Sequence, residues 1–136
     1  MRRMTIYALD TNILSYLLKN DERVCSSLRG ELVAGNTCII PPVAYYEIRR
    51  GLLYVNAVAK LGYFDELCLD FPVGVMNRPA WDETAALYAK LRRNGQIRED
   101  ADLFIAAFCL VGGYTLVTNN IRHFAMIDGL SYTNWQ

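Results

Sequence analysis

The chain has 136 residues, of which 53% are apolar and 21% charged, so its composition favours one globular domain spanning residues 1–136 and excludes a disordered chain. Fourteen basic and fourteen acidic residues leave no net charge, so the total gives no support to nucleic-acid binding. Three arginine pairs could still form a local basic patch, although each pair is also typical of a solvated helix flank. These pairs are Arg2-Arg3, Arg49-Arg50 and Arg92-Arg93.

Alternating apolar and polar patterns divide the chain into strands and helices. Strands are predicted at residues 5–9, 37–40, 69–73 and 115–118. Helices are predicted at residues 12–19, 22–34, 43–54, 56–68, 78–95 and 100–113. Parallel neighbours need long crossover connections, so this alternation predicts an α/β domain with a mainly parallel sheet.

The cysteines and the histidine limit the chemistry that the chain can perform. Four cysteines lie far apart, without the spacing of a metal finger or a C-x-x-C motif. The chain shows no signal-peptide pattern and no apolar run near the ~18 residues of a membrane span, so we expect reduced thiols, a cytoplasmic protein and no membrane contact. The single histidine, His123, excludes a histidine-based zinc site. Any chemistry must therefore rest on carboxylates.

Polar residues follow two predicted strands at the point where each strand ends. Asp10 comes directly after the first strand, with Thr11 and Asn12 behind it, and Thr118 begins the T-N-N segment that ends at Asn120. Ligands of open α/β sheets bind beyond the carboxyl ends of the strands, so these groups are expected at one edge. Asp10 also suits the cap of the helix that follows, and the two roles are compatible.

Two further acids lie at helix starts. Glu47 comes about one turn into the third helix, where it can face the same edge or form an exposed ion pair with Arg50. Asp102 shares a helical stripe with small apolar residues and should face inward, although the helix dipole alone also favours an acid there. Asp100 suits the role of helix cap.

A buried cluster of three carboxylates would repel itself unless a cation lay among them. Oxygen ligands without histidine or cysteine suit Mg²⁺ or Mn²⁺. Such ions keep several waters, and a metal-bound water is a natural nucleophile for a phosphodiester.

The ordered set of motifs resembles the PIN-domain ribonucleases and, within them, the VapC-type toxins of bacterial type II toxin–antitoxin pairs. The matching motifs are L-D-T-N at 9–12, E-x-x-x-G at 47–51, D-x-x-I-A-A at 102–107, G-x-x-L-V-T-N-N at 113–120, H-F at 123–124 and G-L-x-x-x-N-W at 129–135. The resemblance runs from about residue 5 to the C-terminus, while residues 55–98 match only in length and helical character.

The resemblance implies a three-layer α/β/α fold around a sheet of four or five strands, and a Mg²⁺- or Mn²⁺-dependent endoribonuclease. Asp10, Glu47 and Asp102 match the acids that hold the metal and its attacking water, and Thr118 matches a hydroxyl lining the same site. Asn120 stands where many relatives carry a fourth acid. Whether the site binds one metal ion or two is therefore left open by the sequence. Asp100 is a candidate for the missing charge, although we expect it to cap its helix.

The resemblance also implies partners. Family members are commonly homodimers, and a VapB-type antitoxin covers the acidic site with its tail, where an antitoxin arginine would pair with the carboxylates. The antitoxin carries the DNA-binding half, so no direct DNA binding is expected of this chain alone. The substrate is expected to be cellular RNA, with tRNA among the candidates, and nothing in the sequence selects the target.

Two other functions fit parts of the sequence. A haloacid-dehalogenase-type phosphatase also has an acid after its first strand, but it needs a second acid two residues later, where this chain has Asn12. A catalytically inactive PIN-like module that binds RNA or protein is the main alternative, against which the presence of all three acids argues. His123 is expected to pack near Trp135 rather than to act as a general base.

Overall fold

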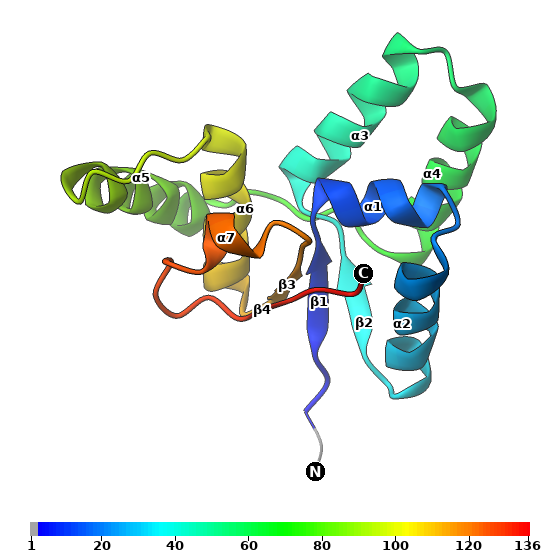
Figure 1. Ribbon diagram of the computed structural model, residues 1–136, viewed down its shortest axis with the longest axis horizontal. Helices are drawn as coiled ribbons and strands as arrows, with labels where there is room; N and C mark the ends of the chain where they lie inside the picture. The colour runs from blue at the N-terminus through cyan, green and yellow to red at the C-terminus, as the bar shows by residue number, and fades with distance from the viewer. Residues whose placement is uncertain (1–2) are drawn as a thin grey trace.

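The computed structural model describes residues 3–136, so Arg2 of the first arginine pair lies outside the described residues. Four described strands form one parallel sheet in the order β2-β1-β3-β4 (Figure 1). Their bounds are β1 Ile6–Leu9, β2 Thr37–Ile39, β3 Thr115–Val117 and β4 Tyr132–Thr133. The predicted α/β class with a parallel sheet is confirmed.

Helices cover both faces of this sheet. Their bounds are α1 Thr11–Leu18, α2 Glu22–Val33, α3 Pro42–Tyr54, α4 Val58–Asp70, α5 Arg78–Arg93, α6 Asp100–Gly112 and α7 Ile121–Phe124. Figure 1 shows α1 to α4 on one side of the strands and α5 to α7 on the other. The arrangement is therefore the three-layer α/β/α fold that the resemblance implied.

The strands divide the core into two halves because successive side chains point to opposite faces of a sheet. Ala8 of β1 and Leu116 of β3 belong to the half packed under α5, α6 and α7. Their neighbours Leu9 and Val117 belong to the half packed under α1 to α4. Because the strands are buried on both faces, their sequences are continuous apolar runs. This apolar pattern is the reason that the first and last predicted strands agree with the structure.

The strand predicted at residues 69–73 is wrong. Leu69 and Asp70 complete α4, and only Val73 forms an isolated parallel bridge, to Ile40. Leu69 is 87% exposed, so the apolar pattern that suggested a strand does not mark a buried segment. Pro72 has no N–H to donate to a ladder, which restricts this segment to a single bridge.

Two short elements near the C-terminus were not predicted. The four-residue helix α7 follows β3, and β4 pairs with β3 through Leu116–Tyr132 and Val117–Thr133. With only two residues, β4 gives no periodic signal in the sequence. It is the fourth strand of the sheet, whereas residues 69–73 contribute only the single bridge of Val73.

The cysteines are free, as expected from their spacing: Cys38 and Cys109 are buried, and Cys25 and Cys68 are partly buried. Burial raises the pKa of Cys38 to about 12 and also raises the pKa of Cys109. These thiols therefore stay protonated and act as small apolar core residues. Among residues 3–136, no helix has the length and apolar character needed to cross a membrane.

Replacing Leu9 should test the core beneath the sheet edge. Leu9→Ala removes a fully buried side chain (0% exposed), so we expect the free energy of unfolding to fall. The expected loss in urea denaturation is about 2–5 kcal/mol. Leu69→Ala makes the same chemical change at an 87% exposed position and should cost less than about 1 kcal/mol. Equal losses for the two variants would contradict this assignment of the core.

Candidate functional site

The pairing of β1 with β3 brings the first two candidate residues together. Leu9 lies opposite Val117, and the backbone N–H of Asp10 donates to the carbonyl of Val117 at 3.0 Å. Asp10 and Thr118 therefore leave the sheet side by side at its carboxyl edge. β1 lies between β2 and β3, so this is the point where the strand order reverses, which is where open α/β sheets bind ligands.

The carboxylate of Asp10 is fixed by three hydrogen bonds. Its Oδ1 accepts from the backbone N–H of Thr11 at 2.8 Å, so Asp10 caps α1 as the sequence suggested. Its Oδ2 accepts from Thr118 Oγ1 at 2.7 Å and from Asn12 Nδ2 at 3.2 Å. The capping role and the edge position are thus compatible in one side chain.

Asp10 is a buried charge without a cationic partner among the described residues. The residue is 4% exposed, and the ion pairs of residues 3–136 do not include it. Burial raises the pKa of Asp10 and the charge of Glu47 raises it further, while the hydrogen bonds from Thr118, Thr11 and Asn12 lower it. An ionised Asp10 is therefore a negative charge that no cation among the described residues neutralises.

Glu47 reaches the same edge from α3. Its Oε1 accepts from Thr11 Oγ1 at 2.8 Å, which ties the first turn of α1 to α3. Its Oε2 lies 3.7 Å from the guanidinium of Arg50, so the alternative ion pair is also formed. The Glu47 side chain is 23% exposed and thus faces both the site and solvent.

Asp102 approaches from α6, on the other side of Asp10. Its side chain is 18% exposed, and burial and the charge of Asp10 raise its pKa, against the lowering effect of His123. The inward stripe predicted for this helix is present, with Ile105, Ala106 and Cys109 buried.

His123 contacts Asp102, which the sequence interpretation missed. Its Nδ1 lies 3.1 Å from Asp102 Oδ2, an arrangement in which the ring donates because an ionised carboxylate only accepts. His123 was expected near Trp135; Trp135 belongs to the core half that contains Leu9 and Val117, where it packs edge-on against Tyr7 with ring centroids 5.2 Å apart. The contact depends on how α7 lies over α6, and the only available signal was that this is the sole histidine.

Asp100 does not cap α6 as predicted. The helix begins at Asp100, so Asp100 is its first helical residue, and Glu99 is the cap residue and makes no side-chain capping bond. Asp100 is an exposed residue of the first turn. Asn120 is also exposed, and only its backbone N–H reaches the site, donating to Thr118 Oγ1 at 3.0 Å.

The donor atoms suit a hard cation, but they do not form a closed set. Asp10, Glu47, Asp102 and Thr118 offer only oxygen atoms, the ligands that Mg²⁺ and Mn²⁺ prefer. Within residues 3–136, however, no three His, Cys, Asp or Glu side chains are arranged to hold one metal ion together. Glu47 is turned towards Thr11 and Arg50 and Asp102 towards His123, so the three acids are neighbours rather than a preformed cage.

Known proteins with similar sequences span nearly the whole chain. The ribonuclease VapC2 of Rickettsia felis is 30% identical over 137 residues, which cover 96% of this chain and 98% of that protein. The ribonuclease VapC1 of Haemophilus influenzae (strain R2866) is 25% identical over 144 residues, which cover 96% and 98%.

Two of the solved structures that resemble this chain are VapBC proteins. VapBC2 from Rickettsia felis, bound to a DNA fragment from its promoter, has a TM-score of 0.87 and 27% identity, covering 97% of this chain and 100% of that chain. VapBC-1 from nontypeable Haemophilus influenzae has a TM-score of 0.85 and 25% identity, covering 96% and 98%. The PIN domain model matches residues 7–130. The chain therefore belongs to the PIN domain family and, within it, to the VapC type.

Proposed function

We propose that this protein is a divalent-metal-dependent endoribonuclease and the toxin of a toxin–antitoxin pair. The observation that carries the proposal is the buried Asp10 carboxylate, which lies at the point where the strand order reverses and has no cationic partner among the described residues. Its acidic neighbours Glu47 and Asp102 both interact with it electrostatically. Relatives named ribonucleases VapC, similar over nearly the full chain, support RNA as the substrate.

In this proposal, Asp10, Glu47 and Asp102 hold a Mg²⁺ or Mn²⁺ ion. Asp10 is the fixed ligand, because Thr118, Thr11 and Asn12 already orient its two oxygens. Glu47 and Asp102 are partly exposed, so their side chains can turn towards the ion.

When bound, the ion would lower the pKa of a coordinated water and polarise the scissile phosphate of the RNA. Thr118 keeps Asp10 oriented through its hydroxyl and takes a hydrogen bond from the backbone of Asn120. His123 is a positioning residue that orients Asp102 and favours its ionised form. The reaction is phosphodiester hydrolysis, in which water attacks phosphorus and a ribose oxygen leaves.

The number of ions follows from the charge available. Asn120 supplies no charge at the fourth acidic position, and its side chain forms no hydrogen bond with the acids among the described residues. Asp100 lies on the exposed side of the first turn of α6, two residues before Asp102. We therefore place one ion at the three acids, with a second entering only with the RNA phosphate.

The partner in this proposal is a VapB-type antitoxin. The similar structures from Rickettsia felis and nontypeable Haemophilus influenzae are VapBC proteins, and their likeness to this chain supports a cognate antitoxin here. A cationic antitoxin side chain would neutralise the acids and displace the metal ion from them. We also propose that the toxin is a homodimer.

Cellular RNA, with tRNA as one candidate, would be the substrate that the protein cuts. Mapping of cleavage ends in total RNA after brief expression would identify the target.

Removal of the Asp10 charge should abolish cleavage. In the purified, antitoxin-free protein, Asp10→Asn should lower the rate of RNA cleavage with Mg²⁺ or Mn²⁺ at least about 100-fold, as loss of a central electrostatic group does. EDTA should abolish the wild-type activity. Asp128→Asn changes an exposed acid that pairs with Lys90 at 3.0 Å, and should leave the rate unchanged. If the wild type binds RNA and never cuts it with either metal, the protein is an inactive binding module and the nuclease proposal fails.

The electrostatics of Asp10 also predict how metal affects stability. The raised pKa means that ionised Asp10 destabilises the metal-free fold, a penalty absent below its usual pKa and fully present once the pH exceeds the raised value. Millimolar Mn²⁺ at neutral pH should therefore raise the Tm. The shift should shrink as the pH is lowered from neutral, because protons compete with the metal for Asp10 and Asp102, whose pKa values are raised. Asp10→Asn should lose most of the shift, and Asp128→Asn should keep it. An equal shift in both variants would place the metal elsewhere.

A further inference from the structure

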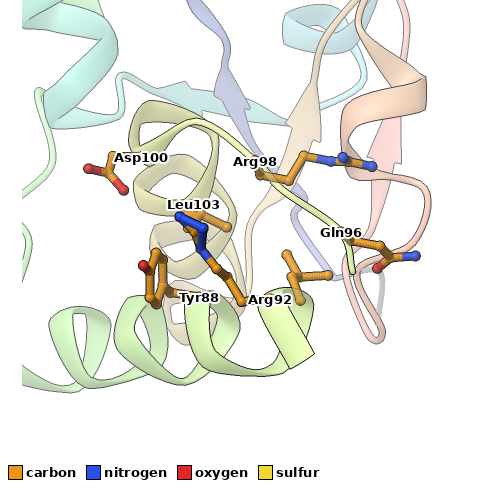
Figure 2. A pocket seen from close by; sticks show the side chains of 7 residues that line it. Tyr88, Arg92, Gln96, Arg98, Asp100 and Leu103 are labelled. Atoms are coloured by element: carbon orange, nitrogen blue, oxygen red, sulfur yellow. The ribbon is translucent and has the colours of Figure 1, made fainter. Parts of the chain in front are cut away.

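A polar pocket lies between the end of α5 and the start of α6, beside the acidic edge of the sheet. Its volume is about 350 Å³, within the range of small-ligand sites. Its lining includes Tyr88, Arg92, Gln96, Arg98, Asp100 and Leu103. Figure 2 shows Tyr88 and Arg92 of α5 close to Leu103 of α6, while Gln96 and Arg98 extend to one side of them from the connecting loop and Asp100 lies on the other side.

Arg92 is an available cation in this pocket. Its guanidinium lies 5.1 Å from the centre of the Tyr88 ring, and it forms no ion pair among residues 3–136. In Figure 2, its side chain extends from α5 towards α6, next to Tyr88 and Leu103. The nearby cation Lys90 differs, because it is paired with Asp128 at 3.0 Å. Arg92 thus has no carboxylate partner among residues 3–136, and its guanidinium lies over an aromatic ring.

Arg98 connects the pocket to the acids. Its Nε donates to the carbonyl of His123 at 3.1 Å, and one terminal nitrogen donates to the carbonyl of Ile97 at 2.9 Å. His123 in turn contacts Asp102 at 3.1 Å. The wall of the pocket is therefore fixed against the same short helix, α7, that positions one of the proposed metal ligands.

The first turn of α6 separates the pocket from the acidic site. Asp100 lines the pocket, and Asp102, two residues later, faces Asp10 and His123. The cap residue Glu99 makes no side-chain capping bond, and the first turn of α6 carries Asp100 and Asp102. The pocket and the acidic site therefore lie on either side of one helical turn, two residues apart in the chain.

We propose that this pocket is the subsite for a nucleotide of single-stranded RNA that flanks the scissile phosphate. Arg92 binds the phosphate or stacks on the base with the Tyr88 ring behind it, as arginine and aromatic planes do in single-stranded RNA recognition. Gln96 offers its amide to a base edge, and Asp100 can accept from a base amino group or a ribose hydroxyl. This inference rests on the proposed function and names the part of the substrate that the nuclease would hold.

The test measures RNA binding without cleavage. A fluorescein-labelled single-stranded oligoribonucleotide of mixed sequence would be titrated with Asp10→Asn protein, which holds the RNA intact, and binding followed by fluorescence anisotropy. Adding Arg92→Ala should weaken binding about tenfold, as loss of one stacked, phosphate-bound contact does. Tyr88→Ala should also weaken it, and Tyr88→Phe should keep it because the ring remains. Arg93→Ala removes the same charge from the next residue, which does not line the pocket, and should change affinity less than about twofold.

In the active protein, Arg92→Ala should raise KM and leave kcat nearly unchanged, since Arg92 binds a flanking nucleotide and not the reacting atoms. Equal losses for Arg92→Ala and Arg93→Ala would overturn the subsite and leave only general attraction of the RNA. Unchanged RNA affinity with a changed oligomeric state on size-exclusion chromatography would also overturn it and assign the pocket to a protein interface. Arg92-dependent binding in a wild type that never cleaves RNA would support the subsite while the nuclease proposal fails.

Discussion

The hydrogen bond between Thr118 and Asp10 is the constraint around which the site is built. It joins residues 108 positions apart at 2.7 Å, and it exists only because β1 and β3 pair in one register. A slip of one residue would turn Thr118 to the opposite face of the sheet. The two core halves oppose such a slip, because Leu116 and Val117 would then exchange their apolar environments. The packing of the sheet therefore fixes the position of the Asp10 carboxylate, without a contribution from loop conformation.

The acids around Asp10 are held close together and restrained at the same time. Burial is the main cause of the raised pKa values of Asp10 and Asp102; the charge of Glu47 adds to the first and the charge of Asp10 to the second, so Asp10 interacts with both neighbours as a like charge. The outer two are each held by another group, Glu47 by Thr11 and Arg50 and Asp102 by His123. A cation at Asp10 would turn this repulsion into attraction. In the proposed enzyme, metal binding and the turning of Glu47 and Asp102 are then a single coupled step.

Sequence reasoning succeeded where the signal is local. Asp10 and Thr118 follow buried apolar strands directly, so their placement at the sheet edge required only the fold class. It failed where tertiary packing decides. β4 has two residues, and the segment at 69–73 has strand-like composition, yet Leu69 is exposed on α4 and Pro72 limits pairing. The contact of His123 with Asp102 depends on the packing of α7 against α6, which no spacing in the sequence encodes.

The zero net charge of the chain does not show that its arginines differ in whether they pair with a carboxylate. Of the two fully described arginine pairs in helices, Arg49-Arg50 is engaged internally, with Asp65 at 2.8 Å and Glu47 at 3.7 Å. In the other pair, Arg92 is stacked on Tyr88 and has no carboxylate partner among residues 3–136. A polyanion is attracted by local unpaired charge and not by the total, and Arg92 offers such a charge on the α5–α6 side. Asp10, which has no cationic partner among the described residues, would repel the same polyanion until a cation neutralised it. In the proposed enzyme, the RNA is therefore held by the protein beside the reaction centre and accepted at the centre only with the metal.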